Sequence, residues 1–159
     1  MSKTKLSKSS PATLMNEPAI SIRQAHWPDE EAALRRVRTS VFVKEQRVPS
    51  DLEWDNQEVS AIHLLAEDPD GKPVGTARLL SNGQIGRMAV LESRRKAGVG
   101  TALLGAALEI ARQKGLPAPF LNAQVSAIAF YRRMGFSETG EEFMEAGIAH
   151  RRMELQQNV

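Results

Sequence analysis

The sequence contains no cysteine, few aromatic residues and no apolar run long enough to span a membrane. The absence of cysteine excludes disulfides, thiolate zinc sites and a cysteine nucleophile, so any acyl transfer by this chain is direct or uses an oxygen or nitrogen nucleophile. Aromatic residues make up 5% of the chain and the formal net charge is +2. Both values are too low for the stacking and basic surfaces of nucleic-acid-binding proteins. We expect a soluble, cytoplasmic protein with neither nucleic acid nor membrane as a partner.

The length of 159 residues corresponds to one domain with a sizeable core. Residues 1–18 are rich in Ser, Lys, Pro and Thr and show no apolar periodicity. We therefore expect a disordered N-terminal tail over residues 1–18 and a single domain over residues 19–159.

The most informative stretch is Ile85–Leu104 (IGRMAVLESRRKAGVGTALL), which predicts a strand, a basic glycine-rich turn and a helix in direct succession. Gly98 and Gly100 bring bare backbone N–H groups to the start of that helix. A helix N-terminus carries about half a positive charge, which suits an anion such as a pyrophosphate.

Three glycine-rich phosphate loops compete for this stretch. A P-loop is excluded because Gly100 is followed by Thr101-Ala102 instead of Lys-Ser/Thr. A Rossmann loop is excluded because Leu103 stands where the third glycine belongs. Arg95–Gly100 (RKAGVG) fits the pattern Arg/Gln-x-x-Gly-x-Gly/Ala, and this segment resembles the acetyl-CoA pyrophosphate loop of the GNAT superfamily. A basic solvated connection remains the alternative for the hexapeptide by itself.

Apolar periodicity and turn residues place the other elements. The expected strands lie near 19–24, 61–67, 72–80, 85–90 and 120–124, the expected helices near 29–42, 98–114 and 126–134, and a final hairpin joins 136–140 to 151–155. Because a helical crossover joins the 85–90 and 120–124 strands, they should be parallel neighbours. The predicted fold class is α/β (α+β), with a mixed central sheet of six or seven strands and helices on both faces.

The first helix has a predicted buried stripe formed by Leu34, Val37 and Val41. Its arginines, among them Arg38, are expected on the other faces. Residues 45–60 (EQRVPSDLEWDNQEVS) follow this helix and are rich in acidic residues. They form either a solvated loop or an acidic, aromatic-edged lid that attracts a cationic substrate.

A second motif makes the resemblance specific. Gln124–Phe136 (QVSAIAFYRRMGF) resembles the GNAT signature Asn-x-x-Ala-x-x-Phe-Tyr-x-x-x-Gly-Phe, with Gln124 in place of the usual Asn. Further runs over 38–49, 53–55, 63–66, 75–79, 86–90 and 140–150 look like the ElaA-like branch of the superfamily. This chain has Arg47 where that branch usually has Gly, and Ala149 where it usually has Pro.

The resemblance implies the GNAT fold for residues 19–159, acetyl-CoA as co-substrate and no metal. It also implies that the backbone of Met88 and Val90 pairs with the pantetheine arm, that a backbone N–H there faces the thioester oxygen, and that Tyr131 protonates the departing thiolate. The positions assigned to the coenzyme are Met88, Ala89, Val90, Arg95, Lys96, Ala97, Gly98, Val99, Gly100, Thr101, Gln124 and Tyr131.

An amine acceptor must lose a proton before it attacks, so a general base is expected. The candidates are Glu45, Glu53, Asp55, His63, Glu142 and His150. We favour Glu45, because its loop should border the acceptor cleft. An isolated histidine within a strand, such as His63, is more often structural.

The function expected from the resemblance is N-acetyl transfer from acetyl-CoA to a small-molecule amine or a protein amino group, by a monomer or a homodimer. An acyl-homoserine-lactone-synthase-like acyltransferase is an alternative, because those synthases share an Arg-x-x-x-Phe start that Arg38 and Phe42 resemble. An acyl-CoA-binding sensor without turnover is a second alternative.

Overall fold

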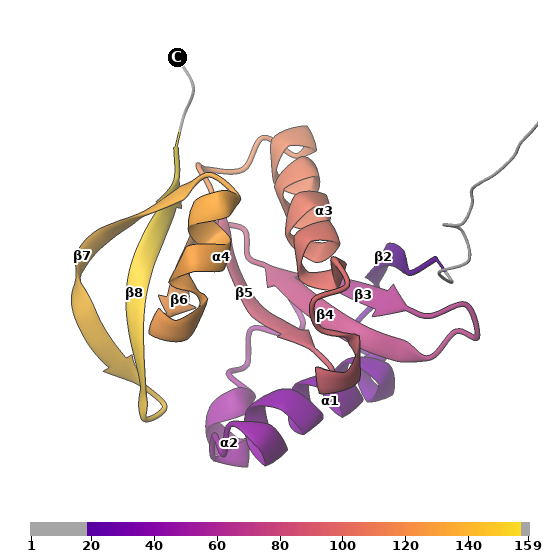
Figure 1. Cartoon of the computed structure of the whole chain (residues 1–159). Helices are drawn as coiled ribbons and strands as arrows, with labels where there is room; N and C mark the ends of the chain where they lie inside the picture. The colour runs from indigo at the N-terminus through magenta and orange to yellow at the C-terminus, as the bar shows by residue number, and fades with distance from the viewer. Residues whose placement is uncertain (1–18, 157–159) are drawn as a thin grey trace, which may run out of the picture.

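The structure is a computed structural model that describes residues 19–156; the predicted tail over 1–18 and the last three residues, 157–159, lie outside the described residues. A seven-stranded mixed sheet has the spatial order β2-β3-β4-β5-β6-β8-β7 (Figure 1). Its strands are β2 Ser21–Ala25, β3 Ile62–Glu67, β4 Pro73–Leu79, β5 Gln84–Val90, β6 Phe120–Gln124, β7 Phe136–Glu145 and β8 Ile148–Leu155. The predicted fold class is therefore confirmed.

Helices cover both faces of this sheet (Figure 1). They are α1 Glu31–Arg38, the π-helical stretch η2 Thr39–Glu45, α2 Ser50–Glu53, α3 Val99–Gln113 and α4 Ile128–Arg133, with the short 3₁₀ turns η3 Glu92–Arg94 and η4 Val125–Ala127. None of the helices within residues 19–156 combines the length and the apolar character that crossing a bilayer requires.

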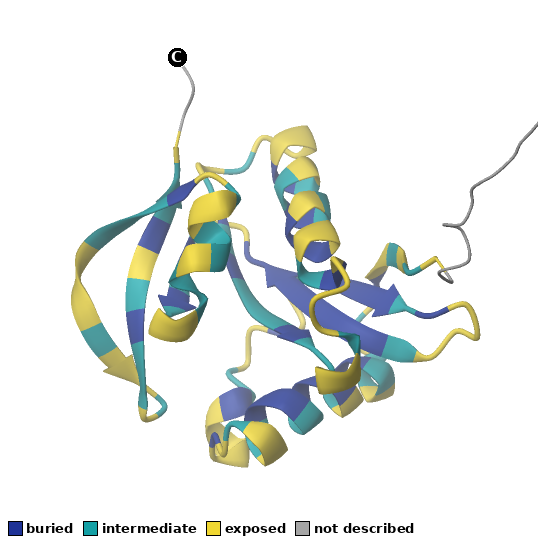
Figure 2. Ribbon diagram, viewed as in Figure 1, coloured by how far each residue is buried: buried dark blue, intermediate teal, exposed yellow. Residues whose placement is uncertain are grey.

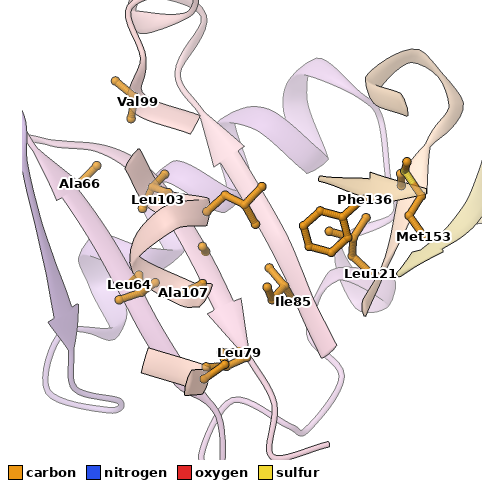
Figure 3. Packing of buried hydrophobic residues seen from close by; sticks show 14 of the residues in the cluster. Leu64, Ala66, Leu79, Ile85, Val99, Leu103, Ala107, Leu121, Phe136 and Met153 are labelled. Carbon is orange, nitrogen blue, oxygen red and sulfur yellow. The ribbon is translucent and has the colours of Figure 1, made fainter. Parts of the chain in front are cut away.

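Helix α3 packs on one face because its apolar stripe meets the inward residues of the central strands. Leu103 and Ala107 are fully buried in one cluster with Leu64 and Ile85 (Figure 3). Gly75 in β4 permits this close approach, since a Cβ atom there would lie 3.0 Å from Leu103 Cδ1. Burying a leucine side chain contributes about 2 kcal/mol, so this cluster is a main source of stability. Figure 2 shows the same division, with buried central strands and exposed outer sides of the helices.

Helix α1 and η2 cover the opposite face. Leu34, Val37 and Val41 are buried, as the helical spacing predicts. Val37 and Val41 pack in one cluster with Ala89 of β5. The expectation for Arg38 is wrong, because this side chain is also buried, with 1% of its surface exposed. Its helix packs over a group of carboxylates that sequence periodicity does not reveal.

Strands β5 and β6 are parallel neighbours, as predicted, but only over a short distance. Their register pairs are Gln84 with Phe120 and Ile85 with Leu121, and the pairing ends there. The remaining part of β5, up to Val90, continues along β4 alone. The sheet is thus open between the two strands beyond Ile85, which leaves backbone groups of β5 free for a ligand.

The closing hairpin is longer than predicted. Strand β7 continues to Glu145 and strand β8 begins at Ile148. They are joined by Ala146 and Gly147, which have φ of 53° and 77°. Two consecutive positive φ values are typical of the tight turns that match strand twist. The sequence did not reveal the extension because acidic residues dominate this part of β7, and charged residues are uncommon in strands. Strand β8 lies between β6 and β7, which brings the end of the hairpin beside the opening in the sheet.

Candidate active site

A cleft of about 770 Å³ occupies the place where β5 and β6 separate. Gly100 and Tyr131 line it from the face that carries α3 and α4. Gln46 and Glu53 line it from the face that carries α1 and α2. The cleft therefore connects the two faces of the sheet, so two ligands can enter it from opposite sides and meet.

The glycine-rich turn forms one end of the cleft. Gly98 is the residue that precedes α3 and has φ 85°, a left-handed conformation that glycine adopts at little cost. A Cβ atom at Gly98 would meet no atom within 4 Å, and one at Gly100 would lie 3.6 Å from Phe130 Cζ. The space beside the first N–H groups of this helix is therefore open to a ligand. The side chains of Arg94, Arg95, Lys96 and Arg133 also line the cleft.

These features fit the pyrophosphate of an acyl-CoA. The first N–H groups of α3 have no acceptor inside the helix, and the positive end of the helix dipole favours an anion. The basic side chains around the turn add to this potential. The residues present are thus suited to hold the phosphate end of the coenzyme.

The free backbone of β5 forms the middle of the cleft. Leu91 N–H donates to Val74 O on β4 at 2.9 Å. Since successive N–H groups of a strand point to opposite sides, Val90 and Met88 direct theirs toward the opening beside β6. A register shift precedes them, where Arg87 has φ 46° and its carbonyl accepts a 3.1 Å hydrogen bond from Thr76 Oγ1. This bulge sets the direction of the Met88 N–H group.

Tyr131 of α4 lines the cleft from the face that carries α3 and α4. Its ring makes edge contacts with Phe130 and Phe136, with centroid distances of 5.0 and 6.1 Å. Its hydroxyl makes no hydrogen bond to any described residue, and burial raises the pKa of Tyr131 to about 12. The phenol therefore stays protonated at neutral pH and is a proton donor in the cleft.

Gln124 connects β6 to the opposite wall of the cleft. Its side-chain Nε2 donates to Gln46 Oε1 at 2.9 Å, and the two residues are 78 positions apart. Gln124, which the sequence predicts to contact the coenzyme, thus lines the cleft, but its side-chain amide is engaged with Gln46. A ligand that uses the Gln124 amide has to compete with this bond.

Glu45, the favoured base, is not brought into the cleft. Both of its carboxylate oxygens accept hydrogen bonds of 2.6 Å from Arg95 Nη1 and Nη2. These bonds lower the pKa of Glu45. A carboxylate held in its charged form by a bidentate guanidinium is a weak proton acceptor. The same pair engages Arg95, which the sequence assigned to the pyrophosphate.

The acidic segment 45–60 is neither a solvated loop nor a free acidic lid. Glu53 and Glu58 are buried, and three arginines surround the carboxylates. Arg38 Nε donates to Glu53 Oε2 at 2.7 Å and Arg78 holds Asp55 with two bonds of 2.8 Å. The remaining ion pairs of this group are Arg38–Glu58, Arg78–Glu58, Arg87–Glu53 and Arg87–Asp55.

This charge network, defined by Arg38, Arg78, Arg87, Glu53, Asp55 and Glu58, is what sequence reasoning missed. Burial raises the pKa of Glu53 and lowers that of Arg38. Burial opposes the charge of Asp55 as well, but hydrogen bonds from Arg78 hold its pKa below the usual range. In the sequence, acids are concentrated in residues 45–60 and the three arginines of the network lie in other segments, a distribution that does not specify which charges pair.

Two histidines from the list of candidate bases occupy different environments. His63 is buried away from the cleft, where its Nε2 lies 2.7 Å from Glu58 O and its ring stacks on Trp27. Burial lowers the pKa of His63, which agrees with the structural role expected for it. His150, in contrast, lines the cleft together with Glu53. Asp55 and Glu142 do not line it. Within the described residues, no three His, Asp or Glu side chains are grouped so as to hold a metal ion.

Comparison with known proteins agrees with this geometry. The family model of the acetyltransferase (GNAT) domain matches residues 25–157. An uncharacterized N-acetyltransferase of Bacillus subtilis, YjcF, is 40% identical over 74% of this chain and 86% of its own length. The crystal structure of an acyl-CoA N-acyltransferase from Pseudomonas aeruginosa is 32% identical, covers 87% of this chain and 100% of its own, and superimposes with a TM-score of 0.78.

The predicted likeness to ElaA is also confirmed. The crystal structure of Escherichia coli ElaA is 28% identical, covers 87% of this chain and 100% of its own, and superimposes with a TM-score of 0.76. Sequence family, fold and an open sheet edge beside a glycine-rich helix start thus agree. The chain is therefore an enzyme of the GNAT acetyltransferase family, with the acyl-CoA N-acyltransferase fold.

Proposed function

We propose that this enzyme transfers the acetyl group of acetyl-CoA directly to an amine, either of a small molecule or of a protein. The observation that carries the proposal is the cleft that passes through the sheet between β5 and β6. Acetyl-CoA enters it from the face of α3 and α4, and the amine enters from the face of α1 and α2. Direct transfer fits a chain without cysteine.

Different residues of the cleft bind different parts of acetyl-CoA. The segment Lys96–Thr101, which includes Ala97, Gly98, Val99 and Gly100, holds the pyrophosphate at the start of α3. The free β5 edge at Met88, Ala89 and Val90 holds the pantetheine arm as an added strand. The Met88 N–H group, oriented by the bulge at Arg87, donates to the thioester oxygen as its charge increases. One preorganised donor of this kind stabilises the transition state by roughly 3 kcal/mol.

Tyr131 supplies the proton that the departing sulfur needs. Its hydroxyl is protonated at neutral pH and makes no hydrogen bond to a described residue, so it is available to the thiolate. The attacking amine also needs a proton acceptor. A lysine-like amine, with a pKa near 10.4, is neutral in only about one molecule in 2,500 at pH 7. Deprotonating it at this pH therefore costs roughly 4.6 kcal/mol of free energy.

Isothermal titration of acetyl-CoA and of CoA into the protein tests the coenzyme part of the proposal. Thiol release from acetyl-CoA in the presence of individual amines from a panel then tests the transfer. Micromolar binding with amine-dependent thiol release is expected. Binding without release by any amine would support a sensor instead, and absence of binding would contradict the assignment of the glycine-rich turn.

A further inference from the structure

We propose that His150 is the general base of the transfer and accepts a proton from the acceptor amine through its Nε2 atom. This inference rests on the proposed function, because it assigns a role within the same cleft. It replaces Glu45, which does not line the cleft and whose carboxylate is engaged with Arg95. Four features of His150 support it.

The first feature is the hydrogen bond of its other ring nitrogen. His150 Nδ1 lies 2.7 Å from Ile148 O. A carbonyl oxygen can only accept, so Nδ1 carries the proton and donates it. In the neutral ring Nε2 is then the atom with the free electron pair. Nε2 has no hydrogen-bond partner among residues 19–156, and His150 lines the cleft. The backbone thus fixes the tautomer that a base requires.

The second feature is the rigid mounting of the ring. His150 is paired in register with Gln124 of β6 on one side and with Phe143 of β7 on the other. Its ring stacks on Phe143 with a centroid distance of 5.8 Å and an interplanar angle of 22°. A side chain in the middle of three paired strands loses little conformational freedom when substrate binds, which favours proton transfer.

The third feature is the face of the sheet on which His150 lies. Ile148, two residues earlier on β8, packs against the cluster that contains Phe42 and Ala89. Residues two apart in a strand share a face, so His150 lies on the α1 and α2 face with them. Ala89 is the middle of the segment proposed to hold the pantetheine arm. His150 therefore lies on the face from which an acceptor would approach, opposite Tyr131.

The fourth feature is the lack of an equivalent competitor. Among acidic and histidine side chains of the described residues, Glu53 is the other one that is buried and lines the cleft. Its Oε2 accepts from Arg38 Nε at 2.7 Å and lies 3.2 Å from Arg87 Nε, so it serves as the counterion of two arginines. Glu145 also lines the cleft, but it is exposed and has no fixed partner among the described residues. Among the described residues that line the cleft, His150 alone combines burial, a fixed orientation and a free basic atom.

The proton balance of the reaction is complete with these groups. The acceptor ammonium gives one proton to His150 Nε2, which later passes it to water. The neutral amine then forms the C–N bond with the carbonyl carbon, and the C–S bond breaks with its electron pair on sulfur. Sulfur takes the proton of the Tyr131 hydroxyl, and the new amide nitrogen gives its surplus proton back to the tyrosinate. The products are the acetylated amine, CoA and one proton.

Two amines with different basicity separate this role from a structural one. We would measure thiol release from saturating acetyl-CoA with 1-aminobutane, which is protonated at pH 7, and with hydroxylamine, which is largely neutral. His150→Asn retains a donor for Ile148 O but no base. We expect it to lose about 100-fold or more with 1-aminobutane and less than about threefold with hydroxylamine. Imidazole added to His150→Ala should restore part of the rate with 1-aminobutane.

Controls distinguish the failure of this inference from that of the proposed function. His26→Asn changes an exposed histidine outside the cleft and should leave both rates unchanged. Equal losses of rate with both amines, in a variant that still binds acetyl-CoA, would overturn only the role of His150 and not the proposed transfer. Absence of thiol release from the unaltered enzyme with every amine would overturn the transfer itself, and this role with it. Nitrogen-15 NMR of the unaltered protein gives an independent check, because a proton on Nε2 of neutral His150 would contradict the proposal even if its variants fail to fold.

Discussion

Arg38 and Glu53 form a buried ion pair in which the guanidinium Nε and the carboxylate Oε2 are 2.7 Å apart, and their side chains are 1% and 4% exposed. Trp54 covers the pair, with its ring centroid 4.5 Å from the Arg38 guanidinium carbon. The pair joins α1 to the segment of α2 that lines the cleft. Stability and the shape of the active site therefore depend on the same contact.

Removal of the arginine should be strongly destabilising. Arg38→Met keeps the apolar stem but removes the nearest cation from the buried Glu53 and Glu58 carboxylates, which leaves only the longer ion pairs with Arg87 and Arg78. The free energy of unfolding should fall by about 3–5 kcal/mol, as measured by urea denaturation. Arg36→Met is the matched control, because Arg36 is exposed on the same helix, and its denaturation midpoint should not change. Similar midpoints for the two variants would show that the buried pair contributes nothing.

The ion pair between Arg23 and Glu30 should make stability depend on pH. A 3.0 Å bond from Arg23 Nη1 is part of the contact that lowers the pKa of Glu30 from 4.5 to about 2. Because the folded-state pKa is the lower one, the contribution is complete above the unfolded-state pKa and is lost as pH falls toward 2. The Arg23 side chain is 43% exposed, so solvent screening limits the contribution to on the order of 1 kcal/mol.

Glu30→Gln tests this expectation. The variant should unfold more easily than the unaltered protein at pH 7, and the difference should narrow between pH 4 and pH 3. It should also shrink at pH 7 in 1 M salt, where the Debye length is about 3 Å. A difference that is constant with pH would assign the effect to lost packing instead of charge.

Gly100→Glu should abolish binding of acetyl-CoA. The new carboxylate would stand beside the first N–H groups of α3, where it repels the pyrophosphate and occupies its place. The fold should persist, because a Cβ atom at Gly100 would lie 3.6 Å from its nearest neighbour, Phe130 Cζ. Gly105→Glu makes the same change at an exposed position on the same helix, where a Cβ atom would meet nothing within 4 Å. In titration calorimetry we expect at least a 100-fold loss for Gly100→Glu and unchanged affinity for Gly105→Glu.

Tyr131→Phe should slow the transfer without weakening coenzyme binding. The change removes only a hydroxyl that has no partner among the described residues, and it retains the edge contacts with Phe130 and Phe136. We expect kcat to fall about 10- to 100-fold, with KM for acetyl-CoA within a factor of two. Since burial raises the pKa of Tyr131 to about 12, the unaltered enzyme should not lose activity up to pH 9 through this group. An unchanged kcat would exclude Tyr131 as the acid.

The glycine-rich turn could be predicted because its chemistry is local. Gly98 needs a left-handed φ at the start of a helix, and this requirement is visible in the order of residues around it. Arg47 shows the limit of such reasoning. It adopts φ 62°, a left-handed conformation that favours glycine, although the residue is an arginine.

The role of Glu45 could not be predicted because it depends on a partner far away in the chain. Arg95 lies 50 positions from Glu45, and nothing in either neighbourhood indicates that they meet. The basic turn and the acidic segment were each interpreted as ligand-facing, whereas part of each neutralises the other. Where two distant segments pack together, the environment of a charged side chain thus differs from the one that the sequence predicts.

Local sequence alone determined the order of the main helices and strands, the glycine-rich turn at Gly98 and Gly100, and the family signature over Gln124–Phe136. These follow from side-chain period, backbone conformation and spacing within a few residues. Tertiary structure alone decided which charges are buried together and which candidate base reaches the cleft. Arg38 meets Glu58 across 20 positions, and His150 reaches the opening because β8 inserts between β6 and β7. Such pairings depend on chain topology, and the sequence near each residue contains no record of it.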